Sequence, residues 1–455
     1  MRGRKISKTV FSRWTPFCSL FSDKHTGENI AEVVDIDLSD KLDLDSKMPK
    51  WGVADNAANM VKALNSSIVD LYTCCCHTQQ LAIGDSFKSF KDTGDNETML
   101  DKSNKCQKLA AHLKRADNSR KLLHAECALA GHKPNAIPVG NDTRWDSVYD
   151  CMRGVLYHQP CLLKMAQAGH LRFEDSNGTT TDLVPSINDF RVIEAGVEIL
   201  EKCKVTTKIF EQEKIPTMPL VTERLYTVDQ ELKEFIQNDQ NKRNKRNAVI
   251  FARILREKLS SRFPQFGTDR SLNRMGNLLN PALKGVHLKL VDKYEETKKE
   301  MEEKLKEWMG EEMDKPVEEE DGGSPPAKIS PTEMLKRRMR QEEERRGGAR
   351  RSDIFTAPQS KFERECSTYE LLADADSSID LLLWWKVHQQ QLPLLSNLAR
   401  IVFAVPAASS KSERVFSVAG NIVTPKRASL NPAKVEQLIT VKCNMQLLRQ
   451  FGIHM

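Results

Sequence analysis

Apolar residues recur at intervals of three and four positions along most of the chain, and this spacing is typical of amphipathic helices. The strongest patterns predict helices over residues 187–210, 220–236 and 248–263. Further helices are expected over residues 25–34, 56–64, 105–130 and 147–163, and from His77 past Ile83. The chain is therefore predicted to be largely helical.

Two segments in the first half break the helical spacing. Trp51–Ala54 is a short apolar run that ends at Asp55, and it predicts a β-strand. Residues 10–21 also carry apolar and aromatic side chains at a density typical of strands. Because helices alternate with these segments, residues 51–165 are expected to form a compact α/β unit.

The pattern changes again toward the C-terminus. Glu, Lys and Met dominate residues 292–319, and mixed charge fills residues 336–351. These residues offer too little apolar surface to order themselves, so 315–355 is predicted to be disordered or an isolated helix. Residues 366–450, in contrast, carry the densest apolar stripes of the chain.

Composition narrows the class of protein. The 455 residues include 69 Lys and Arg against 63 Asp and Glu, a net charge of +6, which allows nucleic-acid binding without requiring it. Mean hydropathy is −0.51, and no apolar run approaches the roughly 18 residues of a membrane span, so no membrane protein is expected. The 11 cysteines form no Cys-x-x-Cys pair, and no signal peptide is predicted, which indicates reduced thiols in an intracellular protein.

Two acidic residues are candidates for metal chemistry. Asp55 follows a predicted strand, and Glu413 opens a predicted helix. A phosphoryl-transfer site with two Mg²⁺ ions needs about three convergent carboxylates. Taken alone, each residue is also typical of an ordinary helix cap.

Five sequence blocks give these residues a context. In chain order they are HTGENIAE (25–32), ADNAANMVKAL (54–64), CCCHTQQLAI (74–83), NDTRWDSVYDCM (141–152) and SERVFSVAGNIVTPKRASLNPAKVEQLI (412–439). This succession resembles the hAT superfamily of transposases, in particular host proteins related to the zinc-finger BED type. The last block resembles the hAT C-terminal dimerisation region most specifically.

The resemblance implies an α/β, mostly helical fold with four parts. These are an incomplete RNase H-like domain (1–165), an all-helical insertion (166–314), a charged disordered linker (315–360) and a dimerisation region that completes the RNase H-like core (361–455). It also implies an Asp–Asp–Glu triad, with its second Asp at Asp55 and its Glu at Glu413. Arg144 and Trp145 correspond to the family's Arg-Trp motif, in which the indole stacks beside a flipped DNA base; core packing is the alternative for Trp145.

The chain departs from the family at its start. Only 24 residues precede His25, and none provides the Asp-x-Trp pattern of the family's first strand. We therefore expect an incomplete triad, no bound Mg²⁺ and no transposase activity. The alternatives are an active Mg²⁺-dependent transposase, with Asp35, Asp37 or Asp40 as the third carboxylate, and a non-functional fragment of a longer gene. Cys18 and His25 alone cannot form a BED finger.

Two further features each have two interpretations from sequence. Cys74 and His77, with His124 and Cys127, have the spacing of two zinc half-sites, but buried packing is the favoured interpretation. A basic stretch is predicted to be a solvated face or a contact for DNA phosphates; it comprises Arg243, Lys245, Arg246, Arg253, Arg256, Lys258 and Arg262.

Association is the function that the apolar C-terminal region favours. We expect a nuclear homodimer with DNA as a candidate partner and with no small-molecule substrate. The side chains predicted to carry dimerisation are Trp384, Trp385, Leu394, Leu398, Phe416 and Leu438.

Overall fold

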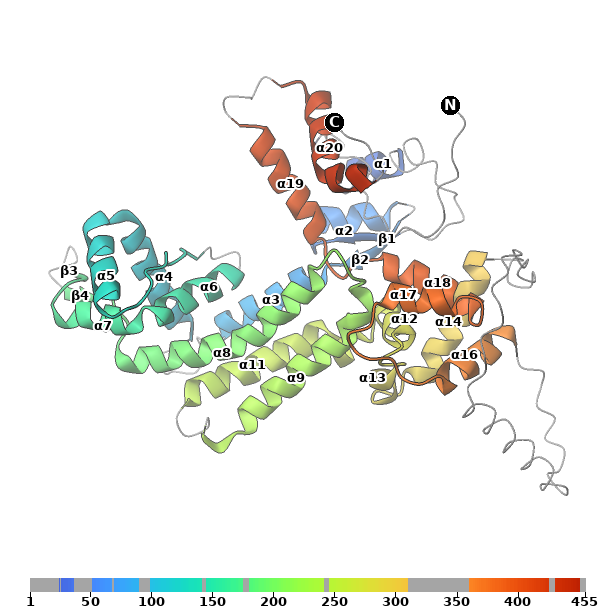
Figure 1. Ribbon diagram of the computed structural model, residues 1–455, viewed down its shortest axis with the longest axis horizontal. Coiled ribbons are helices and arrows are strands. Elements are labelled where there is room, and N and C mark those ends of the chain that lie inside the picture. The colour runs from blue at the N-terminus through green and yellow to red at the C-terminus, as the bar shows by residue number, and fades with distance from the viewer. Residues whose placement is uncertain are drawn as a thin grey trace.

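A computed structural model describes residues 24, 26–36, 51–67, 69–89, 99–140, 145–174, 180–240, 245–309, 360–424 and 430–450. Most of these residues are helical, as predicted (Figure 1). Their strands form two sheets of two strands each. The predicted strand at 10–21 and the charge block at 315–355 lie outside the described residues.

A small parallel sheet stands near the N-terminus. The predicted strand β1 (Trp51–Ala54) pairs in parallel with β2 (Asp70–Thr73), and α2 (Ala58–Asn65) connects them. Parallel neighbours need such a crossover. Helix α1 (Gly27–Ile36) packs on α2. The close packing of β1 on α2 requires glycine at position 52, because a Cβ there would lie 2.9 Å from Leu64 Cδ2.

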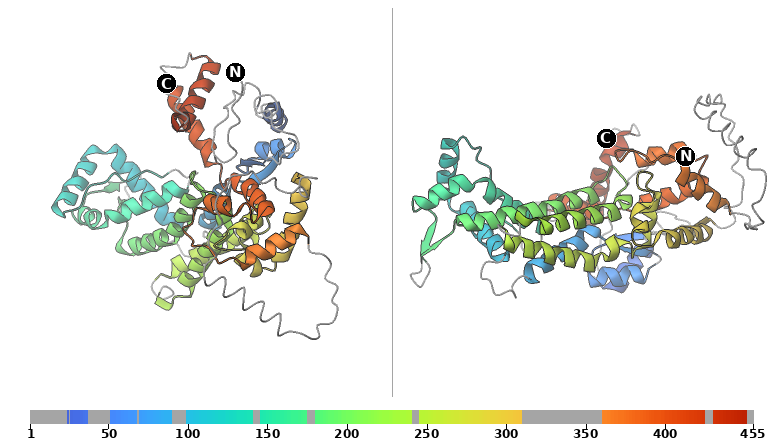
Figure 2. Two further views of the ribbon diagram at one scale, coloured as in Figure 1. Left: turned by 45° about the vertical axis from the view of Figure 1, so that its right-hand side comes forward. Right: turned by 90° about the horizontal axis from the view of Figure 1, so that it is seen from below.

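Four long helices form the centre of the molecule (Figures 1 and 2). They are α3 (Cys75–Ser89), α8 (Ile187–Phe210), α9 (Val221–Gln237) and α11 (Arg246–Arg262). Three of them match predicted helices to within two residues at each end, because each presents one continuous apolar face to its neighbours. The Phe87 and Phe251 rings, with centroids 5.1 Å apart, join α3 to α11.

A lobe at one end of this bundle contains four shorter helices. These are α4 (Met99–Arg115), α5 (Asp117–Leu129), α6 (Trp145–Tyr157) and α7 (Gln159–Gln167), followed by the antiparallel pair β3 (Arg172–Glu174) and β4 (Thr180–Asp182). The prediction of a single helix over residues 105–130 is wrong, because two helices occupy this range. The segment divides at Ala116, whose extended backbone (φ −94°, ψ 99°) interrupts the apolar stripe without changing its spacing.

The remaining helices lie at the other end of the bundle, and one hairpin projects from it (Figure 1). They are α12 (Ser271–Leu279), α13 (Val286–Lys289), α14 (Tyr294–Met309), α16 (Lys361–Leu371), α17 (Leu381–His388), α18 (Pro393–Ala404), α19 (Ser410–Ile422) and α20 (Pro432–Gln450). The short turns η3 (Met218–Leu220) and η4 (Pro264–Gly267) flank α9 and α11. No helix in the described ranges has both the length and the apolarity to span a bilayer.

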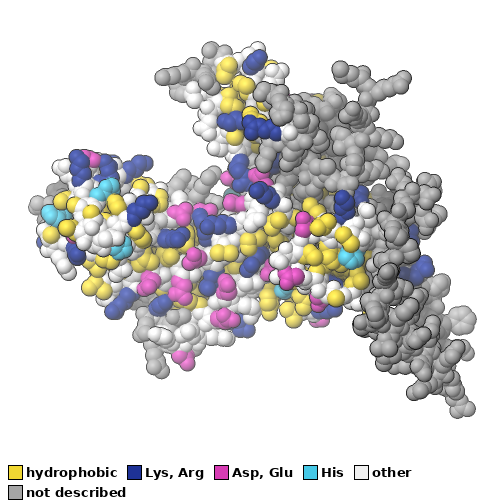
Figure 3. All heavy atoms as spheres, viewed as in Figure 1, with side chains coloured by type: hydrophobic (Ala, Val, Ile, Leu, Met, Phe, Trp, Pro, Cys, Tyr) yellow, Lys and Arg dark blue, Asp and Glu magenta, His cyan; other side chains and the backbone are white. Residues whose placement is uncertain are grey.

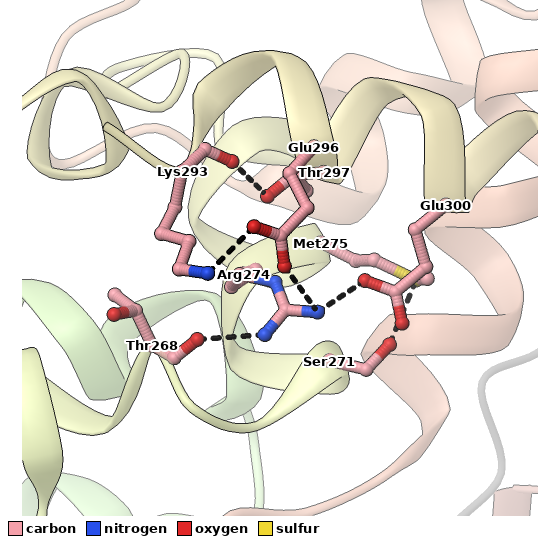
Figure 4. Close-up of polar contacts among 8 residues, drawn as sticks. All are labelled: Thr268, Ser271, Arg274, Met275, Lys293, Glu296, Thr297 and Glu300. Atoms are coloured by element: carbon pink, nitrogen blue, oxygen red, sulfur yellow. Dashed lines mark hydrogen bonds and ion pairs between the residues drawn. The ribbon is translucent and has the colours of Figure 1, made fainter. Parts of the chain in front are cut away.

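Helix α12 is buried along its length although it carries polar side chains. Residues 272–279 are all buried, and Asn273, Arg274 and Asn277 are among them. Arg274 donates from Nη1 to the Thr268 carbonyl oxygen at 2.7 Å and forms an ion pair with Glu300 of α14 (Figure 4). Buried charges are tolerated only when they are paired in this way.

Contacts from α12 reach both ends of the sequence. Asn273 Oδ1 accepts a hydrogen bond from the Tyr72 hydroxyl of β2 at 2.5 Å. The carbonyl oxygens of Leu278 and Leu279 lack partners within their helix, as last-turn carbonyls do. They accept from Tyr369 Oη and Trp385 Nε1, each at 3.0 Å. The C-terminal helices are therefore built on α12.

A buried ion cluster joins the lobe to the bundle. Asp189 is 4% exposed and accepts from Lys102 Nζ at 2.5 Å, Lys105 Nζ at 3.1 Å and the Ser186 amide at 2.9 Å. Burial acts to raise the pKa of Asp189, but the hydrogen bonds from Lys102, Ser186 and Lys105 outweigh it and lower the pKa to about 2. The ionised carboxylate also completes the capping box of α8.

Asp189→Asn is expected to lower the free energy of unfolding by about 3 kcal/mol at pH 7, because two ammonium groups lose their buried counterion. The folded pKa lies below the unfolded value of about 3.9. The carboxylate therefore stabilises the protein fully above that value, and its contribution is lost as the pH falls toward 2. Urea unfolding at pH 7 and pH 3 measures both effects.

Asp182→Asn is the matched control, since Asp182 pairs with Arg172 on the surface and its side chain is 52% exposed. Its cost should stay below about 0.5 kcal/mol. Equal costs for the two variants would contradict the role given to Asp189.

Trp385→Ala is expected to cost about 4 kcal/mol, because it empties a core position and leaves the Leu279 carbonyl oxygen without its donor. Val387→Ala on the same helix should cost less than about 0.5 kcal/mol, since Val387 is 69% exposed. Thermal unfolding followed by circular dichroism compares the two. Similar melting temperatures would show that Trp385 does not support the fold.

Candidate functional site

Three segments meet where the predicted acidic residues lie. The Cys74 amide donates to the Ala54 carbonyl oxygen at 2.7 Å, and the Ser409 amide donates toward Cys74 Sγ at 3.4 Å. Asp55 directly follows Ala54, and Glu413 lies one helical turn beyond Ser409. The structure thus gathers the ends of β1 and β2 and the start of α19 in one place, which we name the junction.

The segment that leads into α19 is fixed by further hydrogen bonds. The Cys75 amide donates to the Ala407 carbonyl oxygen at 2.9 Å, and the Ala407 amide donates to Thr217 Oγ1 at 2.9 Å. Ala407 and Ala408 are buried. The approach to α19 is therefore packed beside the end of β2, a placement that no local sequence pattern indicated and that only the family resemblance implied.

Arg414 ties the first turn of α19 to the end of α8. Its Nε donates to Glu213 Oε1 at 2.7 Å, and its Nη2 donates to the Glu211 carbonyl oxygen at 2.9 Å and to Ser410 Oγ at 3.2 Å. Burial raises the pKa of Glu211, and the charges of Asp146 and Glu413 raise it further. The junction therefore collects several carboxylates, but Arg414 and Lys204 lie among them.

Asp55 is exposed, and its Oδ1 accepts from the Ala57 amide at 3.2 Å, a local turn contact that precedes α2. Across the described part of the chain, no group of three or more His, Cys, Asp or Glu side chains is placed to hold a metal ion. Asp35 lies in α1, whereas Asp37 and Asp40 fall outside the described residues. The described side chains do not fit a site for two Mg²⁺ ions.

Trp145 is the first residue of α6 and is only 6% exposed. Its ring centroid lies 6.4 Å from that of Tyr149 within the hydrophobic core. The core-packing alternative describes this conformation, because a buried indole cannot stack on a nucleotide base. Arg144, its neighbour in the Arg-Trp motif, lies outside the described residues.

The two Cys/His pairs lie in different parts of the fold. Cys74 and His77 are at the start of α3 in the bundle, whereas His124 and Cys127 are in α5 of the lobe. Cys74 and Cys127 are buried free thiols, and His124 is exposed. The described residues include no group of three or more His, Cys, Asp or Glu side chains that brings the two pairs together.

Three of the seven residues in the predicted basic stretch form ion pairs with neighbouring helices. Its ion pairs are Lys245 with Glu198 at 2.9 Å, Arg256 with Asp229 at 2.6 Å and Arg262 with Asp85 at 2.5 Å. Arg243 lies outside the described residues. These pairs tie α11 to its neighbours, so these three side chains stabilise the bundle.

A second basic region escaped the sequence patterns. Residues 99–167, which include the four lobe helices, contain 11 Lys and Arg against 6 Asp and Glu. Figure 3 shows Lys and Arg side chains on the visible face of this lobe. Charge summed over this segment would have revealed the excess, whereas a search for runs of basic residues did not.

Four of the six residues predicted for dimerisation are buried within the protomer. Trp384, Trp385, Leu394 and Leu398 are each 8% exposed or less. The rings of Trp384 and Trp385 pack on Tyr369, with centroids 5.8 and 5.4 Å from it. These four apolar side chains pack in the core around α12. They therefore cannot directly contact a second copy in this conformation.

The exposed apolar side chains lie on the projecting hairpin of α19 and α20, which we name the arm. Phe416 is 69% and Leu438 40% exposed, as a contact with a partner requires. Val423 and Met445 add 46% and 37% exposed side chains that were not predicted. Figure 3 shows hydrophobic side chains along the arm, which packs mainly on itself.

The C-terminal region of the chain is similar to known proteins. Residues 363–445 match the hAT family C-terminal dimerisation region. A Zea mays protein named as an AC transposase is 36% identical over 73 residues, which are 16% of this chain and 9% of that protein. The zinc finger BED domain-containing protein RICESLEEPER 2 of Oryza sativa subsp. japonica is 33% identical over 100 residues, 21% of this chain and 14% of that protein.

A third relative is tpeD of Talaromyces stipitatus, named as a transcriptional regulator, with 31% identity over 86 residues, 19% of this chain and 10% of that protein. The chain thus matches only about a tenth of the length of these relatives. The matched family region contains α16 to α19 and most of α20. Through this C-terminal region, the chain is similar to hAT transposases and to zinc finger BED domain-containing relatives.

Proposed function

We propose that the chain is a catalytically inactive hAT transposase derivative that self-associates through the arm and binds DNA in the nucleus. The observation that carries this proposal is the dimerisation region at 363–445, whose last two helices leave large apolar side chains exposed. Isolated exposed apolar residues are common, but a row of them on one hairpin is typical of an interaction surface.

The proposed partner is a second copy of the chain. Dimers with a self-complementary interface are the most frequent soluble assemblies. Helix α20 has apolar residues on several faces, and α19 covers only one of them; Val435 and Val441 are half-buried, and Leu438 is exposed. A second arm packed against the first would cover the rest.

The basic lobe supports the DNA part of the proposal. Lys108, Lys114 and Lys133 are exposed and positively charged, and duplex DNA binds such surfaces by releasing counterions. The relation to proteins named as transposases and as a transcriptional regulator favours a nuclear role in regulation.

The inactive state is supported by the carboxylates of the junction. Asp55 bonds the Ala57 amide and Glu413 stands beside Arg414, and neither belongs to a described set of three ligands. Transfer of a phosphoryl group depends on charge stabilisation and positioning by such a set. The β1–α2–β2 unit is the part that supports an incomplete RNase H-like domain.

Phe416→Asp is expected to weaken self-association by about tenfold or more, because it places a charge at the most exposed large side chain of the arm. Sedimentation equilibrium of the full chain at micromolar concentration measures this. Ser417→Asp is the matched control, since it adds the same charge to the next, also exposed, position of α19.

The native chain and Ser417→Asp should both be dimers, and Phe416→Asp should be mostly monomeric. A native chain that is monomeric at every concentration would reject self-association. Dimers that persist in both Phe416→Asp and Leu438→Asp would reject the arm as the interface.

Incubation with Mg²⁺ and DNA that carries hAT-type terminal repeats is expected to give no cleavage, and Glu413→Gln is expected to leave this result unchanged. Gel shifts on the same DNA should show binding that weakens steeply with salt. Cleavage that disappears in Asp55→Asn and in Glu413→Gln would instead establish the active Mg²⁺-dependent enzyme.

A further inference from the structure

Helix α19 exposes one side, while its other sides hold it to the protein. Arg414 binds Glu213 and the Glu211 carbonyl oxygen after α8, and Ile422 is buried in the hairpin that α19 forms with α20. Phe416 lies two positions after Arg414, and helix positions two apart do not face the same way. Phe416 accordingly points away from the α8 contact and is 69% exposed.

The exposed side of α19 is apolar and uncharged. Phe416, Gly420 and Val423 have the spacing of residues that share one face of a helix, and all three are exposed. We name these three residues the α19 face. A surface for DNA phosphates needs Lys or Arg, and none of the three carries a charge. The α19 face therefore suits an apolar protein surface rather than DNA.

Gly420 has no structural reason within its own protomer. It lies inside α19, where glycine is one of the least favourable residues, and its φ is not positive. A Cβ at this position would meet no described atom within 4 Å outside the backbone of its own helix. At Gly52 and Gly276, in contrast, a Cβ would press on neighbouring groups. Glycine at position 420 therefore weakens the helix without improving the packing of the described protomer.

A second helix packed on the α19 face would give this glycine a role. The distance between two crossing helices depends on the side chains at the crossing point, and glycine allows the closest approach of two backbones. On the α19 face, Gly420 leaves a notch between the larger side chains of Phe416 and Val423. The crossing point of a partner helix is therefore expected at Gly420.

The α19 face is complementary to a second copy of itself. Phe416 lies four residues before Gly420, and Val423 lies three residues after it. If two α19 helices run antiparallel and cross at Gly420, each Phe416 ring comes opposite the other copy's Val423. Such a contact has the two-fold symmetry of most soluble dimers. The face also lies within residues 363–445, the part that matches the family's dimerisation region.

We propose that two copies of the chain pair by an antiparallel crossing of their α19 helices at Gly420. Phe416 of each copy packs on Val423 of the partner subunit, and the two-fold axis passes beside the two glycines. This arrangement rests on the self-association proposed above and specifies the helix, the direction and the crossing point. Gly420 is a positioning residue in it, because it sets how closely the two helices approach.

Gly420→Ala should raise the dissociation constant of the full chain about tenfold, because two added methyl groups push the helices apart. Sedimentation equilibrium measures this. Gly84→Ala is the matched control, since Gly84 also lies inside a helix, α3, and a Cβ there would meet nothing within 4 Å. The control should leave the dissociation constant unchanged. An unchanged constant in Gly420→Ala would overturn the crossing at Gly420.

The same substitution should have the opposite effect on α19 in a single protomer. In the Phe416→Asp background, in which association is weakened, adding Gly420→Ala should slow hydrogen exchange of the α19 amides several-fold, because alanine favours the helix. A stabilised helix that associates less well is the signature of a glycine selected for contact with a partner. Faster exchange would show that Gly420 supports its own protomer and would overturn the proposal.

A charge swap tests the antiparallel direction. Phe416→Lys and Val423→Glu should each raise the dissociation constant about tenfold or more. The double variant should associate more tightly than either single variant, because the new ammonium group of one copy lies opposite the new carboxylate of the other, and high salt should remove this gain. Ser417→Lys combined with Val423→Glu is the control and should show no such gain, because Ser417 lies outside the α19 face.

The outcomes separate this proposal from the one on which it rests. A native chain that stays monomeric would reject self-association and the crossing together. A native dimer that Phe416→Asp weakens but Gly420→Ala does not would keep the arm as the interface and overturn the crossing at Gly420. A charge-swap variant that is no tighter than its two single variants would overturn the antiparallel direction.

Discussion

The structure depends on a helix whose polar side chains are buried. Asn273 and Arg274 lose their water when α12 enters the core. Asn273 accepts from Tyr72 of β2 and Arg274 pairs with Glu300 of α14, whereas Arg274 Nε has no hydrogen-bond partner among the described residues. Gly276 allows close approach on the same helix, because a Cβ there would lie 3.1 Å from the Met218 carbonyl oxygen. The strand that carries Tyr72 and the helices that carry Tyr369 and Trp385 are thus held by one element.

This arrangement explains why the matched family region is not an independent unit. Helices α16 to α18 bury their aromatic residues on the end of α12, and Lys284 after α12 forms an ion pair with Asp374 at 3.1 Å. Only α19 and α20 continue beyond this contact. The C-terminal region therefore has a base that belongs to the core and an arm that leaves it, although one sequence family describes both.

Local sequence patterns predicted the long helices and β1, because the spacing of apolar residues that indicates each element can be read within that element. Strand β2 escaped because it has four residues and directly precedes α3, so its apolar residues merged with the helical pattern. Trp384 and Trp385 were predicted to contact a second copy but are buried within the protomer. An apolar residue indicates burial, but its sequence does not indicate whether the same chain or a partner chain covers it. The convergence of Ala54, Cys74 and Ser409 depends on contacts across more than 300 residues, which no local pattern contains.

The attachment of the arm has a mechanical consequence. Its two helices touch mainly each other, and its root is held by Arg414 and by the segment beside Cys74. A force applied at the far end of a rigid projection held at one end produces its largest bending moment at the point of attachment. A partner bound at the tip of the arm therefore exerts a torque on the residues around Glu413. Force on the periphery of the molecule is transmitted in this way to the junction.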